Sequence, residues 1–146
     1  LKYSIDPPYQ GLSNLVKKQE EQRHFKDWQG EVKKEIEKIA GLTAIDGATV
    51  IDDSYNMLSF GAKLLRQDGK PVIDQLFYTE PVIGGKSNKI DPNQMGGTRH
   101  LSAAQFVQDH NDCIALVASQ DGRFTIFSWS SSEKLVHAHR IDILLL

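Results

Sequence analysis

The amino-acid sequence predicts a mixed α/β fold, a single domain in which a mixed central β-sheet contains antiparallel hairpins and is flanked by helices. Three patterns lead to this class. A long helix-forming stretch comes first, two pairs of short apolar runs follow, each joined by a polar turn, and a short amphipathic stretch separates the two pairs. The chain has 146 residues, of which 40% are hydrophobic. That is enough to bury one core.

The first expected element is a helix within residues 13–40. Its apolar residues recur at spacings of three and four, which predicts one buried face, and they are Phe25, Trp28, Val32, Ile36 and Ile39. Gly30 is a candidate break in this helix, and Gly41 is expected to end it. The preceding segment, IDPPYQG, is expected to be irregular, because Pro7 and Pro8 fix φ and lack an N–H.

Two β-hairpins are expected after this helix. The runs ATVI and MLSFGAKLL are joined by DDSYN, and CIALVAS and RFTIFSW are joined by Gln120, Asp121 and Gly122. The Asp-Gly step is typical of a tight hairpin turn. Between the hairpins, residues 66–96 are expected to form long loops around one strand, VIDQLFY, and the tail KLVHAHRIDILLL is expected to hold a last strand.

Composition argues against several classes of partner. The formal net charge is −2, so the chain lacks the basic excess of proteins that bind nucleic acid. No apolar run reaches the roughly 18 residues of a membrane span, and no signal peptide opens the chain, so we expect a cytoplasmic protein without a membrane segment. The chain begins with Leu1 and not with methionine, so we expect a fragment of a longer protein with a further domain, although processing would give the same start.

Cysteine and histidine give little sign of a metal site. Cys113 is the single cysteine, so neither a disulfide nor a cysteine-rich metal site is expected, and its apolar run predicts a buried core thiol. His137 and His139 are two residues apart in the tail, a spacing that can bind metal. A pair of surface histidines is the commoner arrangement and is the expectation here.

The stretch MGGTRHLSAAQFVQD, residues 95–109, is expected to be a tight loop that leads into a helix over residues 102–109. The N–H groups at a helix start carry partial positive charge, and Thr98, Arg99 and His100 add donors beside them. The loop therefore predicts a phosphate site, although a glycine-rich loop with one surface arginine is more often plain structure.

A second motif, DGA at Asp46, Gly47 and Ala48, follows the long helix. A carboxylate at the mouth of a strand, followed by a residue without a side chain, can meet a metal ion or a sugar hydroxyl at close range. A turn aspartate is the alternative for this motif taken alone.

Together, the two motifs resemble the diadenylate cyclase family, whose domain occurs in the DNA-integrity scanning protein and in membrane-linked bacterial cyclases. The order matches that of the family: DGA follows an amphipathic helix, GTRH opens a short helix with SA following, and an apolar strand ends in serine before an Asp-Gly turn. The resemblance runs from about residue 31 to residue 129. It implies a connecting segment at 1–30 and a nucleotide-binding domain at 31–146.

The resemblance implies an activity and a partner. Members of the family condense two ATP molecules into cyclic di-AMP and release two pyrophosphates. Each domain holds one ATP, so catalysis implies a face-to-face homodimer or a higher homo-oligomer, with Mg²⁺ or Mn²⁺. The alternative is a catalytically weak or inactive signalling module that binds ATP or cyclic di-AMP. A structural α/β domain whose motifs are coincidental is the third possibility.

The resemblance also implies roles for individual residues. Asp46 would serve the 3′-hydroxyl and the metal ion, and Asp121 falls where many relatives carry an acidic residue that can touch the metal. Leu64, in the run FGAKL, would contact the base. The full set of implied nucleotide-binding residues is Gly47, Ala48, Leu64, Gly97, Thr98, Arg99, His100 and Ser119.

One position departs from the family pattern. Relatives usually have a second arginine after the histidine, where this chain has Leu101. The change removes a charge-assisted phosphate contact worth about 1.5–3 kcal/mol, unless Lys63, Lys86 or Lys89 supplies the cation instead. The segment between the two motifs is also longer than in compact relatives, and its extra loop could cover the site or mediate assembly.

Overall fold

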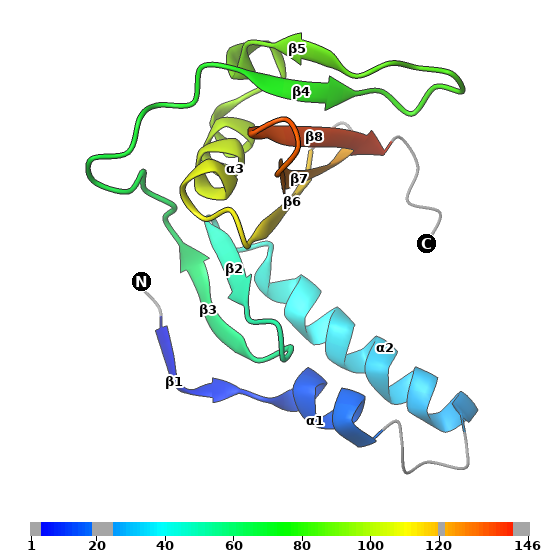
Figure 1. Cartoon of the computed structure of the whole chain (residues 1–146). Helices are drawn as coiled ribbons and strands as arrows, with labels where there is room; N and C mark the ends of the chain where they lie inside the picture. The colour runs from blue at the N-terminus through cyan, green and yellow to red at the C-terminus, as the bar shows by residue number, and fades with distance from the viewer. Residues whose placement is uncertain (1–3, 19–24, 120–121, 142–146) are drawn as a thin grey trace. The chain divides into compact units, whose positions relative to one another are not determined.

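The computed structural model describes residues 4–18, 25–119 and 122–141, and within them the chain is a mixed α/β protein with three α-helices and eight strands (Figure 1). The expected fold class is therefore confirmed. The described residues form two compact units, which divide between Lys63 and Leu64. The hairpin expected first lies in a three-stranded sheet of the first unit, and the mixed sheet, with five described strands, belongs to the second.

The first unit contains two helices and three strands among its described residues. They are β1 (Ser4–Tyr9), α1 (Gly11–Lys18), α2 (Phe25–Leu42), β2 (Ala48–Ile51) and β3 (Met57–Ala62). The strands pair antiparallel in the order β1-β3-β2, so β1 is an edge strand. The expectation of an irregular segment around Pro7 and Pro8 is wrong, because an edge strand tolerates proline where no ladder N–H is needed.

Helix α2 continues through both glycines that the sequence marks as a break or an end. It passes Gly30 and stops at Leu42, one residue after Gly41. A Cβ at either glycine would meet no atom outside the helix backbone within 4 Å, so only helix propensity disfavours them. The division expected between residues 30 and 31 falls inside this helix, and the assignment of 1–30 and 31–146 stays a prediction.

The apolar face of α2 is only partly buried. Ile39 is buried, and Trp28 donates a hydrogen bond from Nε1 to the carbonyl oxygen of Leu15 in α1 (2.8 Å). Ile36 is 51% exposed, so its expected burial is wrong. Successive helix residues are turned by about 100°, which puts Ile36 at the edge of the apolar stripe, away from Trp28. The side chain of Phe25 lies outside the described residues. Within the described ranges no helix, α2 included, has the length and apolar content that a membrane span needs.

The first expected hairpin, β2 and β3, is confirmed. Its loop is ordered by the Asp52 carboxylate, which accepts hydrogen bonds from the backbone N–H of Ser54 (3.0 Å) and from the backbone and side-chain nitrogens of Asn56 (both 2.8 Å). These bonds, first among them the one from the Asn56 side chain, hold the pKa of the Asp52 carboxyl below its usual value. The loop is thus fixed by contacts within the sequence DDSYN itself.

Gly47 of the DGA motif has a structural role of its own. Its φ is +119°, and a Cβ there would lie 2.5 Å from the carbonyl carbon of Gly61 in β3. Both the backbone angle and the close approach favour glycine, whatever the motif binds.

We expect Gly47→Ala to lower the free energy of unfolding by about 1–3 kcal/mol, because alanine must adopt a strained φ and push β3 away. Urea unfolding followed by circular dichroism measures the change. Gly30→Ala is the matched control, since a Cβ there meets no neighbour within 4 Å. It should raise stability by about 0.5–1 kcal/mol. A neutral Gly47→Ala would mean that the contact with Gly61 does not exist in solution.

The second unit holds one α-helix, one 3-10 helix and five strands among its described residues. They are β4 (Leu76–Thr79), β5 (Asn88–Ile90), η2 (Pro92–Gln94), α3 (Thr98–Asp109), β6 (Ile114–Ala118), β7 (Phe124–Ser130) and β8 (Leu135–Ile141). The order of the sheet is β5-β4-β8-β7-β6. Strands β4 and β8 pair in parallel, and the other neighbours are antiparallel.

Most of the strands expected in this unit are confirmed. The hairpin of β6 and β7 is present and the tail holds β8, while Gln120 and Asp121 of the expected turn lie outside the described residues. Of VIDQLFY, only the last three residues belong to a strand. The region expected to be loops also contains β5 and η2. Strand β5 is held by its pairing with β4, and its own polar sequence does not predict a strand.

Helix α3 begins four residues earlier than expected, at Thr98. Gly97 is its N-cap, with extended backbone (φ −77°, ψ −171°), and the Gly97 carbonyl oxygen accepts a hydrogen bond from the His100 N–H at 3.0 Å. Thr98, Arg99 and His100 therefore form the first turn of the helix and not a loop before it. This correction matters because first-turn residues surround N–H groups that have no partner within the helix.

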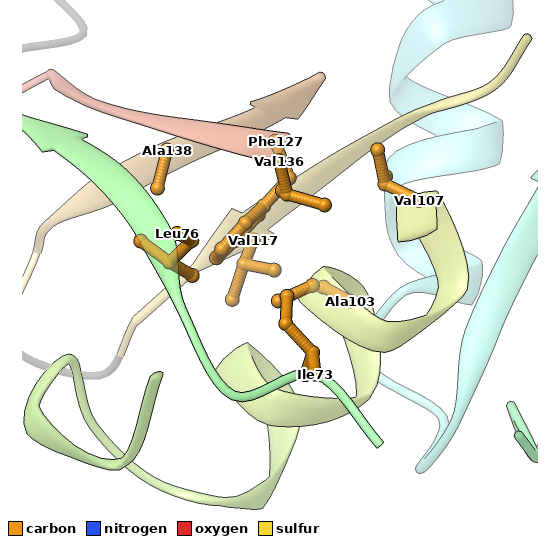
Figure 2. Packing of buried hydrophobic residues seen from close by; sticks show 9 residues of the cluster. Ile73, Leu76, Ala103, Val107, Val117, Phe127, Val136 and Ala138 are labelled. Carbon is orange, nitrogen blue, oxygen red and sulfur yellow. The ribbon is translucent and has the colours of Figure 1, made fainter. Parts of the chain in front are cut away.

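The core of the second unit lies between α3 and one face of the sheet (Figure 2). Phe127 is fully buried, and its cross-strand neighbours, Ala115 and Ala138, are small, so the phenyl ring fills the space beneath the helix. Ala104 and Val107 of α3, both fully buried, belong to the same cluster. This packing fixes α3 against the strands that line the pocket described below.

The other face of the sheet carries exposed apolar side chains and two histidines. Ile114 and Leu116 of β6 are 64% and 57% exposed. The rings of His137 and His139 stack with centroids 3.9 Å apart, and His137 Nε2 lies 2.7 Å from Thr79 Oγ1. His139 is exposed as expected, whereas His137 is half-buried, and burial lowers its pKa.

Cys113, expected in the core, is half-buried in the turn before β6. The alternation of β6 explains the difference, because its inward-facing residues are Ala115 and Val117, and Cys113 lies before the strand begins. Burial raises the pKa of the Cys113 thiol, so the thiol form is favoured at neutral pH.

Candidate functional site

A pocket of about 490 Å³ lies in the second unit, between the start of α3 and the sheet. One wall consists of residues 95–100, the loop and first turn of α3. The other wall consists of Tyr78 of β4, Val117, Ala118 and Ser119 at the end of β6, Arg123 and Thr125 at the start of β7, and Arg140 of β8. Its volume is within the range of small-molecule sites.

The helix wall of the pocket is the N-terminal end of α3. The first N–H groups of a helix have no carbonyl partner within it and carry partial positive charge, so they attract anions. Gly97, as N-cap, adds no side chain that could satisfy them. Gly96 has φ +151°, and a Cβ there would lie 3.1 Å from His100 Nδ1. Glycine at both positions leaves the start of α3 open to a ligand.

The side chains of the first turn differ in how firmly they are held. Thr98 and Arg99 are exposed, whereas His100 is half-buried. The His100 ring meets Phe127 edge-on, with centroids 6.1 Å apart and ring planes at 67°. Because Phe127 belongs to the core, this contact orients the His100 ring from the core side of the pocket.

The sheet wall is a row of side chains across three strands. Val117, Thr125 and Arg140 are successive cross-strand partners on β6, β7 and β8. Val117 and Thr125 are buried, and the side chain of Arg140 is 18% exposed. At the hairpin end, the Ser119 N–H donates a hydrogen bond to the Arg123 carbonyl oxygen (2.8 Å), which keeps these two residues together beside the pocket.

The charge of the pocket favours an anion. Among the described residues that line it, three are arginines and none is acidic. Arginine stays protonated at every physiological pH, and its planar fork matches phosphate and carboxylate oxygens. Three guanidinium groups beside a helix start therefore favour a ligand that carries several negative charges.

Five of the implied nucleotide-binding residues meet in this pocket. They are Gly97, Thr98, Arg99, His100 and Ser119. The first four are consecutive, but Ser119 comes from the far end of β6, so its presence depends on the fold and not on the motif.

The other implied residues are not brought to this pocket. Asp46, Gly47 and Ala48 belong to the first unit, which is described by itself, so their part in the site stays a prediction. Leu64 follows β3 and is not among the residues that line the pocket. Asp121, the second implied metal ligand, lies outside the described residues. Within the described ranges, no cluster of three or more His, Cys, Asp or Glu side chains could hold a metal ion.

Apart from Arg99, the cations of the pocket are not those that the sequence predicted. Leu101 is half-buried and does not line the pocket, and neither do Lys86 and Lys89. Lys63 is the last residue of the first unit. The positive charge beyond Arg99 comes from two other arginines.

Arg123 and Arg140 are thus functional candidates that sequence reasoning missed, and both had a readable signal. Arg123 directly follows the Asp-Gly turn that Ser119 precedes. On β8, one strand face reads Val136, Ala138, Arg140, so an arginine interrupts an otherwise apolar face. A charged residue on the buried face of a strand needs a partner or a ligand.

Comparisons of this chain with protein-family models, with curated proteins and with solved structures found no match. The diadenylate cyclase family therefore stays a resemblance carried by the two motifs. The pocket itself supplies the independent argument about what the chain binds.

Proposed function

We propose that the chain is a diadenylate cyclase, an enzyme that condenses two ATP molecules into cyclic di-AMP. The observation that carries the proposal is the pocket, where Thr98, Arg99 and His100 of the motif lie with Ser119, two further arginines and no described acidic residue. These donors suit the triphosphate of a nucleotide.

The proposed reaction uses both motifs. The 3′-hydroxyl oxygen of one ATP attacks the α-phosphorus of the other, the bond from that phosphorus to the bridging oxygen breaks, and pyrophosphate leaves with the bonding electrons. The hydroxyl proton passes to a base, for which we propose Asp46. A second, reciprocal attack closes the ring and releases the second pyrophosphate. The arginines and helix N–H groups stabilise the charge on the phosphates as each bond exchange proceeds.

We propose Asp46, which is exposed in the bend before β2, as the protein ligand of a divalent ion. Mg²⁺ in nucleotide sites typically takes one or two carboxylates from the protein and the remaining ligands from phosphates and water. Asp46 with phosphate oxygens would hold Mg²⁺ or Mn²⁺, and the ion would neutralise charge on the phosphates.

The proposed reaction needs two protomers. Each attack runs from one ATP to the other, so two loaded chains must face each other, and we propose a homodimer or a higher homo-oligomer as the active form.

A nucleotide-binding module without turnover is the second candidate, and the absence of an arginine at Leu101 favours it. Incubation of the purified chain with ATP and Mn²⁺ or Mg²⁺, followed by mass analysis of the products, separates the two. Cyclic di-AMP supports the cyclase, whereas bound ATP without product supports the module. A chain that neither binds ATP nor forms product rejects both.

We expect Arg99→Ala to weaken ATP binding by about 10- to 150-fold, the effect of losing one charge-assisted hydrogen bond of about 1.5–3 kcal/mol. Isothermal titration calorimetry with Mg-ATP measures it. Arg66→Ala is the control, because Arg66 is an exposed arginine of the same unit that does not line the pocket. Unchanged affinity in Arg99→Ala would remove Arg99 from the site.

A further inference from the structure

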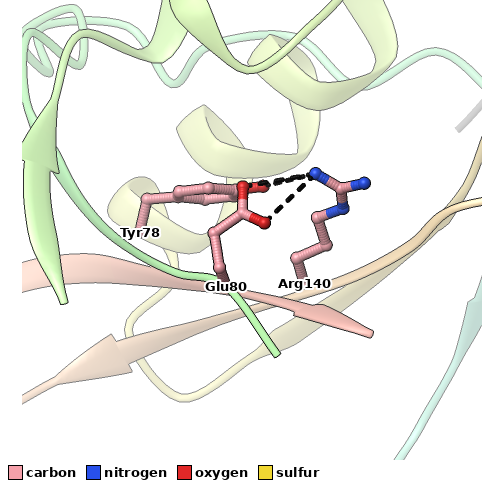
Figure 3. Close-up of polar contacts among 3 residues, drawn as sticks. All are labelled: Tyr78, Glu80 and Arg140. Atoms are coloured by element: carbon pink, nitrogen blue, oxygen red, sulfur yellow. Dashed lines mark hydrogen bonds and ion pairs between the residues drawn. The ribbon is translucent and has the colours of Figure 1, made fainter. Parts of the chain in front are cut away.

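Arg140 of β8 is held by two residues at the end of β4, Tyr78 and Glu80 (Figure 3). Its Nη1 donates hydrogen bonds to Glu80 Oε1 (3.2 Å) and Oε2 (3.4 Å) and to Tyr78 Oη (3.4 Å). The contact follows from the parallel pairing of β4 and β8, in which Thr79 lies opposite His139. Because side chains alternate along a strand, the next pair, Glu80 and Arg140, meets on the face that carries Tyr78.

This arrangement shields the cation more than its carboxylate partner. Val136 and Ala138, which precede Arg140 on the same face of β8, are fully buried. The side chain of Arg140 is 18% exposed and that of Glu80 is 46% exposed. Arg140 lines the pocket and Glu80 does not. The positive end of the ion pair is therefore the end that faces the pocket.

Glu80 and Tyr78 hold the guanidinium of Arg140 through one of its nitrogens. All three hydrogen bonds named above use Nη1, and Figure 3 shows Nη2 pointing away from Glu80 and Tyr78. A guanidinium carries five N–H donors in a planar fork and can serve more than one acceptor at a time, which suits a residue that both pairs with Glu80 and lines the pocket. Burial raises the pKa of the Tyr78 phenol, so Tyr78 adds no negative charge beside the pocket at neutral pH.

We propose that Arg140 is a phosphate-binding residue of this pocket, that Glu80 and Tyr78 are its positioning residues, and that together they supply the cation that is missing at Leu101. The inference rests on the proposed function of the pocket as a site for the polyphosphate of a nucleotide. A half-buried charge acts on phosphate through a lower effective dielectric than exposed Arg99 does, so salt screens its attraction less. Because Glu80 and Tyr78 hold Arg140 in place, we expect Arg140 to fix the position of the phosphates.

Calorimetric titration with Mg-ATP and with inorganic tripolyphosphate tests the proposal. Arg140→Gln should weaken the binding of both ligands about tenfold or more. Arg140→Lys keeps the charge but loses the planar fork of donors, so its loss of affinity should be smaller than that of Arg140→Gln. Glu80→Gln should also weaken the binding of both ligands. Because Glu80 acts through Arg140, the double variant Glu80→Gln/Arg140→Gln should bind no more weakly than Arg140→Gln alone, which a separate structural role of Glu80 would not produce.

Arg66→Gln is the control, since it removes the same charge from an exposed position outside the pocket, and its affinities should stay within about twofold of the unaltered chain. If Arg140→Gln binds tripolyphosphate normally, or if Arg66→Gln loses as much, this inference is overturned and the proposed function stands. If the unaltered chain binds neither ligand, the proposed function fails and the inference with it. Should Arg140→Gln not fold, unchanged affinities in both Arg140→Lys and Glu80→Gln would overturn the inference.

Discussion

Replacing Asp46 with asparagine is expected to abolish formation of cyclic di-AMP while most of the affinity for ATP remains. Asparagine has the same size, but it cannot take a proton from the 3′-hydroxyl and is a weaker ligand for a divalent ion. Loss of a general base alone slows a reaction by about 10²–10⁴-fold. ATP affinity should stay within about threefold, because Arg99, Arg123 and Arg140 line a pocket to which Asp46 is not assigned. Product mass analysis and calorimetry on one preparation measure both quantities.

Asp53→Asn is the matched control for this prediction. Asp53 is an exposed carboxylate of the same unit, in the loop between β2 and β3. Its replacement should leave turnover and ATP affinity unchanged. If Asp46→Asn lowers binding and turnover equally, Asp46 contributes to ground-state binding and not to the chemical step.

Mixed dimers make the role of Asp46 more specific. In a dimer of one unaltered and one Asp46→Asn chain, only one 3′-hydroxyl has its base. One attack can then occur and the ring cannot close, so a linear dinucleotide that keeps one triphosphate should accumulate, with one pyrophosphate released. Cyclic product from such mixed dimers, beyond the amount that the remaining unaltered dimers make, would show that Asp46 is not the base for its own hydroxyl.

The parts of the fold that were predictable are those with local signals. The hairpins β2–β3 and β6–β7 are read from apolar runs around short polar turns, and the Asp52 hydrogen bonds with Ser54 and Asn56 show that the first turn is specified within five residues. Strands β1 and β5 escaped prediction because their own sequences lack a strand signal. One contains two prolines and the other is polar, and each exists because a neighbouring strand offers it a ladder.

The candidate site, like the fold, has one part with a local sequence signal and one part that depends on distant pairing. Thr98, Arg99 and His100 form a contiguous motif, so the sequence identified them, although it placed them before the helix and not in its first turn. Arg140 and Glu80 lie 60 positions apart and meet only through the parallel pairing of β4 with β8. Parallel pairing leaves no turn signal between its partners, so the contact between Arg140 and Glu80 could be found only from the fold.

Phe127→Ala is expected to produce the largest loss of stability, about 3–5 kcal/mol in the free energy of unfolding. Phe127 is fully buried, and its cross-strand neighbours Ala115 and Ala138 are too small to fill the space that the phenyl ring vacates. A cavity beneath α3 should therefore remain. The loss is a large share of the roughly 5–15 kcal/mol that stabilises a typical domain. Urea unfolding of the purified variant measures it.

The change should also reach the pocket, because the His100 ring loses the edge contact that orients it. Weaker ATP binding is therefore expected in the folded fraction of Phe127→Ala. Ile114→Ala on neighbouring β6 is the control. Its side chain is 64% exposed on the opposite face of the sheet, so its removal should change stability by no more than about 0.5 kcal/mol and leave ATP binding unaltered. If Ile114→Ala costs as much as Phe127→Ala, the outer face of β6 is buried in solution, and the cluster around Phe127 is not the sole core on which this sheet depends.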